Sequence, residues 1–168
     1  ALLLAGCQTP SPVREIKEMK FTIDSSLIDQ RYSAPDSEFS FSPPIHFAQF
    51  SVSELGLFSQ DAENLQNGMQ PIKSKFIAVF GDSLTRGLVI VSEILNSDSG
   101  RITSKEYDQL LSENIDSTKV NTQKFLKNGE TVCLYATRDE EYFSYLLFFE
   151  SRYGKLIQLN YQIPADVN

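Results

Sequence analysis

The sequence predicts a single α+β domain, a mainly antiparallel sheet of about five or six strands carrying two or three helices. Its 168 residues include 41% hydrophobic residues, with 12 Phe and 7 Tyr, which is enough apolar material for a substantial core. Strand-like segments follow one another through short loops, and such neighbours must pair antiparallel. Two capping boxes mark the starts of helices between them.

The first residues resemble the end of a bacterial export signal. Leu4-Ala5-Gly6-Cys7 is similar to the lipobox of bacterial lipoproteins, and a polar, Pro-containing run follows it. The resemblance implies that residues 1–6 are a signal-peptide remnant and that the Cys7 thiol carries a diacylglyceryl group. Gln8, after the cysteine, implies outer-membrane localisation if the source is Gram-negative. The alternative is a short apolar N-terminal strand.

Net charge limits the partners that the chain can attract. With 15 Lys and Arg against 22 Asp and Glu, the formal charge is −7, and no basic cluster is present to bind phosphates. Nucleic acid and electrostatic adhesion to anionic lipid are therefore excluded as binding modes. We expect the membrane to be a partner only through the acyl anchor at Cys7. Each buried methylene contributes about 0.8 kcal/mol to such an anchor.

Residues 7–36 are predicted to be the lipidated cysteine and a flexible tether, because prolines recur among few apolar residues. The folded domain is assigned to residues 37–168. It begins with alternating polar and apolar residues at 38–42, a strand pattern that Pro43-Pro44 ends. Ser51-x-x-Glu54 is a capping box, and the helix that it starts closes at Asn67-Gly68.

The remaining elements follow in order. Residues 75–80 and 88–95 read as strands joined by a loop. Thr103-x-x-Glu106 is the second capping box, and residues 118–126 are predicted to be a further helix. Three strands are predicted at 130–137, 142–150 and 155–163. One face of the last strand, with Gln158, Asn160 and Gln162, is predicted to be exposed to solvent. The predicted order is β-α-β-β-α-β-β-β.

This order resembles the PsbP-like fold. The similar parts are Phe39-Ser40-Phe41-Ser42-Pro43-Pro44 before the first helix, Phe76-Ile77-Ala78-Val79-Phe80-Gly81-Asp82 before a hairpin, and the closing hairpin. The resemblance spans most of residues 37–163. It implies a sandwich of sheet and helices, and a role in binding or assembly without catalysis.

One motif points to an enzyme instead. Phe80-Gly81-Asp82-Ser83-Leu84-Thr85-x-Gly87 resembles the signature of GDSL lipases and esterases, which implies Ser83 as a nucleophile. The Asp-x-x-His and Gly-x-Asn-Asp segments of that family are absent, and the single histidine, His46, lies upstream. We therefore interpret the motif as a hairpin loop and regard it as a coincidental match. A serine ester hydrolase using Ser83, with His46 as its base, is the alternative.

Other candidate sites are weaker. Cys133 lies in an apolar strand with no cationic neighbour and is expected to be a core residue. Asp139-Glu140-Glu141 is expected to be a solvated turn, with a calcium site as the alternative. Tyr142, Phe143, Tyr145 and Phe148 alternate between the two faces of their strand, so both faces are expected to be covered.

The sequence thus predicts a lipid-anchored, exported domain that binds or assembles with an envelope protein. No cofactor or metal is expected, and no catalytic residue beyond the alternative pair. Ser83 and His46 are kept as that pair, and Cys7 as the site of lipid attachment.

Overall fold

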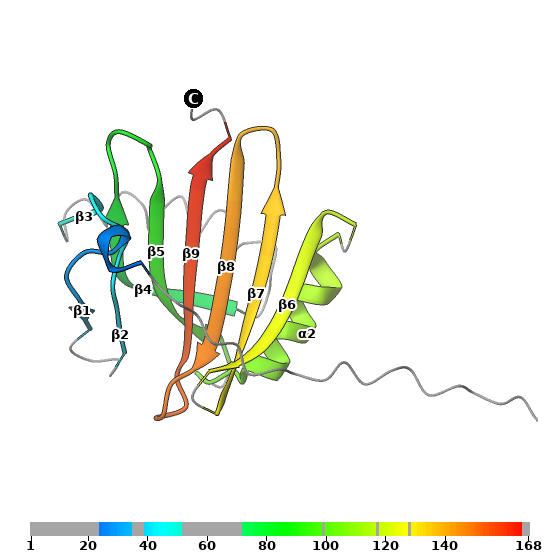
Figure 1. The fold of residues 1–168 in the computed structure, drawn as a ribbon. Coiled ribbons are helices and arrows are strands. Elements are labelled where there is room, and N and C mark those ends of the chain that lie inside the picture. The colour runs from blue at the N-terminus through cyan, green and yellow to red at the C-terminus, as the bar shows by residue number, and fades with distance from the viewer. Residues whose placement is uncertain are drawn as a thin grey trace, which may run out of the picture.

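Seven strands form one antiparallel sheet in the computed structural model of the chain, in the order β3-β4-β5-β9-β8-β7-β6 (Figure 1). The structure describes residues 24–34, 39–51, 72–98, 100–116, 118–127 and 129–165. Every neighbouring pair in this sheet is antiparallel, as the short loops predict. The mainly antiparallel α+β class is confirmed, with more strands than the expected five or six.

Six long strands make up most of the sheet. They are β4 (Ile72–Gly81), β5 (Leu88–Asn96), β6 (Val120–Lys127), β7 (Glu130–Arg138), β8 (Tyr142–Glu150) and β9 (Leu156–Pro164). Five of them coincide with predicted strands, and turns at residues 139–141 and 151–155 join the last three. The sheet order differs from the chain order because β9, the last strand, pairs between β5 and β8.

Short elements precede the long strands. A 3-10 helix, η1, spans Ser25–Leu27, and β1 (Tyr32–Ser33) pairs with β2 (Ser40–Phe41) in a separate ribbon. Strand β3 (Ala48–Gln49) adds to the edge of β4. We call residues 24–34 and 39–51 the N-terminal cover. Because Ala34 is buried and Tyr32 pairs with Phe41, the packed part of the chain includes residues assigned above to the tether.

Helix α2 spans Ser104–Asn114 and begins at the predicted capping box. The Thr103 hydroxyl accepts the Glu106 N–H at 3.2 Å, and the Thr103 N–H donates to the Glu106 carboxylate at 2.8 Å. Two N–H groups that a helix start leaves unpaired are thereby satisfied. Among the described residues this is the single α-helix, and the helix predicted after Ser51 lies outside them.

Strand β6 corrects one prediction. Residues 118–126 were expected to be helical, but residues 120–127 pair with β7 from Val120 opposite Thr137 to Lys127 opposite Glu130. Val120, Thr122 and Phe125 are β-branched or aromatic residues, which suit a strand, and Phe125 is buried on one side of the sheet. Pairing along a whole neighbouring strand outweighs the local helical pattern. Among the described residues, the element order predicted from the sequence is therefore wrong at residues 118–126, where a strand replaces the expected helix.

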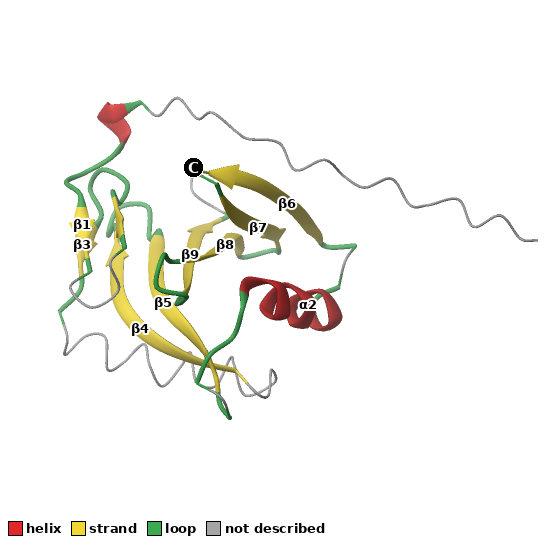
Figure 2. Ribbon diagram, turned by 90° about the horizontal axis from the view of Figure 1, so that it is seen from below, coloured by secondary structure: helices red, strands yellow, loops and turns green. Residues whose placement is uncertain are grey.

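The sheet separates two hydrophobic cores, because successive side chains point to opposite faces. Helix α2 packs on the side that we call the helix side, and the N-terminal cover packs on the other, the cover side (Figure 2). In β8, Phe148 belongs to the helix-side core and Phe149 packs against the cover-side core. The buried residues of the helix-side core are Ile94, Ile102, Tyr107, Leu111, Cys133, Tyr135, Phe148 and Leu156. Those of the cover-side core are Ala34, Phe39, Phe47, Ala78, Phe80, Val89, Val91 and Ile157.

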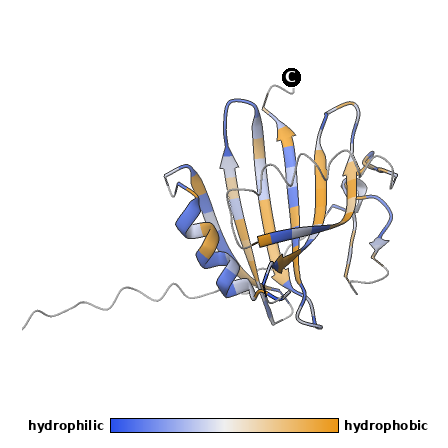
Figure 3. Cartoon of the chain, turned by 180° about the vertical axis from the view of Figure 1, so that it is seen from behind, coloured by the Kyte–Doolittle hydropathy of each residue, from blue (hydrophilic) through white to orange (hydrophobic). Residues whose placement is uncertain are grey.

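Helix α2 also explains why neither face of β9 is fully exposed to solvent. Gln158 was predicted to face water, yet it is 8% exposed and accepts a hydrogen bond from the Tyr107 hydroxyl. Tyr107 lies on the buried side of α2, and the hydrophilic residues of the helix face outward (Figure 3). The helix covers the polar side of the strand, and Tyr107 supplies the hydrogen bond that a buried amide needs.

Within the described residues, no helix has the length and apolar character needed to cross a bilayer.

Candidate functional site

The loop of residues 82–87 contains the serine singled out above. It joins the antiparallel strands β4 and β5, and the pair Gly81–Leu88 closes it. The Asp82 N–H donates to the Gly87 carbonyl at 3.0 Å. The loop is therefore a hairpin connection, as predicted, and not the strand-to-helix turn that presents a serine nucleophile in α/β hydrolases.

Asp82 organises this loop. Its carboxylate accepts the Leu84 N–H at 3.0 Å, the Thr85 N–H at 3.3 Å and the Thr85 hydroxyl at 2.8 Å. The Leu84 N–H and the Thr85 hydroxyl, in that order, are the main groups that lower the pKa of the Asp82 carboxyl. Two backbone N–H groups beside Ser83 are thus already bound to a carboxylate.

The two glycines of the motif are required by close packing. A Cβ on Gly81 would lie 2.7 Å from the Phe50 ring, and one on Gly87 would lie 2.8 Å from the Phe47 ring. Neither glycine has a positive φ, whereas Arg86 does, at 58°. These glycines therefore allow the loop to pack against the aromatic rings of the N-terminal cover.

Ser83 and His46 do not form a nucleophile–base pair in the described structure. Ser83 is exposed, and its hydroxyl makes no hydrogen bond to any described residue. His46 is exposed in a turn with a φ of 72°, and its charge is a minor cause of the lowered Asp82 pKa. His46 is therefore close enough to act on Asp82, but a serine without a hydrogen-bonded base remains a weak nucleophile.

Cys133 lies in the helix-side core, as predicted. Its side chain is buried and unpaired, and burial raises the pKa of its thiol to about 11, with the Asp108 carboxylate adding to the shift. Few thiolates form at neutral pH under such conditions. Cys7, the predicted lipid attachment site, lies outside the described residues.

The acidic run at residues 139–141 forms the β7–β8 turn. The Asp139 carboxylate accepts the N–H groups of Glu141 at 2.8 Å and Tyr142 at 2.6 Å. In the described part of the chain, no three His, Cys, Asp or Glu side chains come together as metal ligands would. The geometry is that of a hydrogen-bonded turn.

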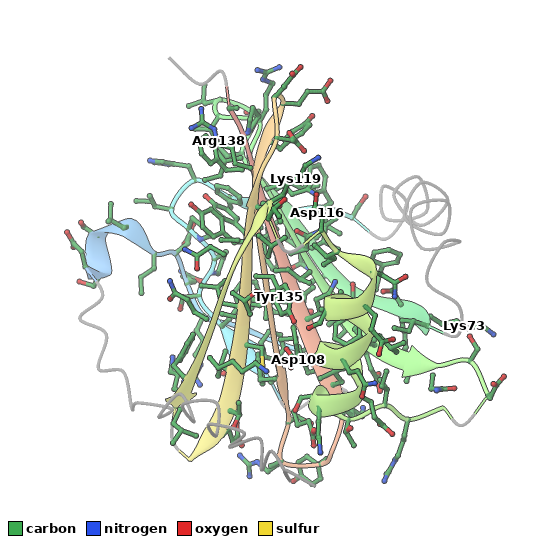
Figure 4. All side chains as sticks on the ribbon, turned by 90° about the vertical axis from the view of Figure 1, so that its right-hand side faces the viewer. Lys73, Asp108, Asp116, Lys119, Tyr135 and Arg138 are labelled. Atoms are coloured by element: carbon green, nitrogen blue, oxygen red, sulfur yellow. The ribbon has the colours of Figure 1, made fainter. Side chains whose placement is uncertain are left out.

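A polar cluster between α2 and the sheet was not predicted from the sequence. The Tyr135 hydroxyl donates to the Asp108 carboxylate at 2.8 Å (Figure 4). Lys124 forms an ion pair with the same carboxylate. Burial is the main cause that raises the pKa of Tyr135 to about 12. The cluster joins α2 to β6 and β7, and no sequence spacing indicates it because its residues lie on three elements.

The cover side of the sheet has two hollows beside the area on which the N-terminal cover packs. The buried residues of the cover pack against β4, β5 and β9, while the cover side of β6, β7 and β8 carries two hollows. The smaller, about 390 Å³, lies among Lys119, Asn121, Arg138, Phe143 and Tyr145. Arg138 and Lys119 lie toward the same end of the sheet (Figure 4).

The larger hollow, about 520 Å³, lies between β2 and strands β6–β9. Phe39 and Phe41 line it from the cover, and Val132, Leu147 and Leu159 line it from the sheet. The sequence indicated an excess of aromatic residues but not this cavity, because β6 was predicted to be a helix.

No family model and no curated protein matches the chain. Among solved structures, it is similar to the solution structure of cyanobacterial PsbP (CyanoP) from Synechocystis sp. PCC 6803. The identity is 20%, with a TM-score of 0.46, over 88% of this chain and 86% of that chain.

Proposed function

We propose that the chain is a lipid-anchored, exported domain with a non-catalytic role in binding or assembly at the cell envelope. The observation that carries the binding role is the hollowed cover side of β6–β8, where aromatic and aliphatic side chains make up most of the lining of the larger cavity. Concave, mainly apolar sites with a few polar groups are typical of ligand and partner binding.

The geometry of the β4–β5 loop supports a non-catalytic role. Asp82 already accepts the N–H groups of Leu84 and Thr85, so these donors are committed to the loop and not to a developing oxyanion. The Ser83 hydroxyl has no hydrogen-bonded base among the described residues. The loop has the interactions of a stable hairpin turn.

The anchor and the location rest on the lipobox resemblance at Leu4-Ala5-Gly6-Cys7. Acyl groups on Cys7 would hold a chain of charge −7 at an anionic membrane surface that otherwise repels it. In a Gram-negative cell the location would be the outer membrane, and an envelope protein would be the macromolecular partner.

Membrane fractionation tests the anchor. We expect Cys7→Ser to move the chain from the membrane to the soluble fraction, because residue 7 then has no thiol to form a thioether with a diacylglyceryl group. Cys133→Ser is the matched control and should stay with the membrane, since that thiol is buried. A Cys7→Ser chain that still fractionates with membranes would contradict the lipobox interpretation.

Fluorophosphonate labelling tests the alternative, a serine ester hydrolase that uses Ser83. Because no described residue is hydrogen-bonded to the Ser83 hydroxyl as a base, we expect no labelling of the wild-type chain above that of Ser83→Ala. Labelling that disappears in Ser83→Ala would establish an activated serine and overturn the non-catalytic role. His46→Ala would then show whether the nearby imidazole is the base.

A further inference from the structure

The larger hollow has a defined size, and most of the residues that line it are apolar. Its volume, about 520 Å³, lies within the range of small-molecule sites, about 300–1,000 Å³. Phe39 stacks on Phe41 at 5.6 Å between ring centroids and contacts Phe149 at 5.9 Å. These rings form a wall that joins the N-terminal cover to the sheet.

Strand register arranges the sheet side of this hollow in rows. Phe125 lies opposite Val132, and Val132 lies opposite Phe149, so the three form one apolar row across β6, β7 and β8. The next row includes Leu147 opposite Leu159. Phe125 and Val132 are buried, whereas Leu147 and Leu159 are half-buried, so the inner surface is apolar along more than one row.

The charged residues that line the hollow lie at the turns that join these strands. Lys127 and Glu130 face each other at the β6–β7 turn, and Arg152 lies in the β8–β9 turn. Arg152 forms no ion pair within the described residues and lies over the Tyr153 ring at 5.8 Å. The rim therefore has one more positive than negative charge in a chain of net charge −7.

We propose that this hollow binds a single-chain amphiphile with an anionic head group, such as a fatty acid. The acyl chain lies along Phe125, Val132 and Leu147, and the head group meets Arg152 at the rim. An acyl chain fits because apolar side chains line the cavity along two rows of the sheet, and the charged lining residues lie at the β6–β7 and β8–β9 turns. The inference deepens the proposed binding role, on which it rests, by naming the ligand class.

Calorimetric titration with laurate tests the assignment. The chain used is the full-length protein with Cys7→Ser, so that neither its own acyl groups nor detergent competes for the site. We expect saturable binding of one laurate per chain, weaker binding of dodecyl maltoside and of dodecyltrimethylammonium, and none of acetate. Laurate that binds no better than dodecyltrimethylammonium would overturn the anionic head group.

Two variants with matched controls place the ligand. Arg152→Gln should weaken laurate binding by about two- to fivefold, the scale of an exposed ion pair, and leave dodecyl maltoside unchanged. Arg138→Gln is its control, because Arg138 also lies over an aromatic ring, Phe143, at 4.7 Å, but lines the smaller hollow. An equal loss in Arg138→Gln would overturn the assignment to the larger hollow.

Leu147→Trp fills the cavity without adding charge and should abolish laurate binding. Leu84→Trp is its control, because Leu84 is 85% exposed in the β4–β5 loop. Near-ultraviolet circular dichroism verifies that both variants are folded. Laurate binding that survives in a folded Leu147→Trp chain would overturn the proposal.

Failure of this inference is distinguishable from failure of the proposed function. If the wild-type chain binds no laurate, the proposed ligand class is wrong. The results of membrane fractionation and of fluorophosphonate labelling are unaffected by that outcome. Conversely, Ser83-dependent labelling would overturn the non-catalytic role. Laurate binding that depends on Leu147 and not on Ser83 would still identify the larger hollow as the ligand site.

Discussion

Three carboxylates have the same structural role in this chain, those of Asp82, Glu106 and Asp116. Each carboxylate accepts a backbone N–H at the start of a turn or helix. These hydrogen bonds and those from neighbouring hydroxyls lower the pKa of each group. A folded pKa below the unfolded value means that the carboxylate stabilises the fold above the unfolded pKa. That stabilisation is lost as the pH falls through the folded value.

We therefore expect the melting temperature of the chain to fall below about pH 4, where unfolded carboxyl groups begin to bind protons. Asp82→Ala should lower the melting temperature at neutral pH and make its decline in acid less steep. Glu140→Ala is the control, because Glu140 is an exposed acid without a hydrogen bond in the described structure. Equal changes in the two variants, measured by thermal denaturation from neutral pH to about pH 2, would contradict a specific role of Asp82.

Cys133 is expected to be unreactive while the protein is folded, since the residue is 3% exposed and burial raises the pKa of its thiol to about 11. In the Cys7→Ser chain, iodoacetamide at about pH 8 should label it slowly, and urea should accelerate the reaction. Ser83→Cys in the same chain supplies an exposed thiol for comparison. If Cys133 reacted as fast as a cysteine at residue 83, the described core around β7 would be incorrect.

At the scale of elements, local sequence patterns predicted most of the sheet. Hairpins were predictable because short loops between apolar strands leave antiparallel pairing as the only arrangement, and α2 was predictable because Thr103 and Glu106 form its capping box. Strand β6 was not predictable, because its pairing partner β7 lies beyond it in the chain and overrides its local pattern.

The candidate site was less predictable than the fold. The Gly81–Gly87 motif identified the correct loop, but not the Phe50 and Phe47 rings that require those glycines. The larger hollow lies between β2 and four strands, so its residues become neighbours only through sheet order. No local spacing of residues in the sequence indicates that β9 pairs between β5 and β8.

One hydrogen bond joins α2 to β9, from the Tyr107 hydroxyl to the Gln158 amide. Tyr107→Phe would leave the Gln158 amide buried without its donor, which costs about 1–3 kcal/mol. Urea denaturation should show this loss, and the double variant Tyr107→Phe/Gln158→Leu should recover part of it. Tyr153→Phe, at a tyrosine that is 53% exposed, should have little effect. A single Tyr107→Phe variant as stable as wild type would contradict the proposed role of the bond.

At the scale of the whole molecule, the sheet is covered from both sides at its centre and less so toward β6. Backbone amides of β5 and β9, which have a strand on each side and a core on each face, should exchange with solvent most slowly. Amides of β6 that do not face β7 should exchange fastest among the long strands. Hydrogen exchange measured by mass spectrometry tests this order, and equally slow exchange in β6 would indicate that another chain covers that edge.

The alternation of Phe148 and Phe149 between two separate cores limits how this protein can change in length during evolution. Deleting one residue in the middle of β8 would send every following side chain to the opposite face and exchange the contents of the two cores. Insertions and deletions should therefore be tolerated in the turns at residues 139–141 and 151–155, and selected against within β8 and β9. Related sequences should differ in the lengths of these turns and keep the spacing of apolar residues between them.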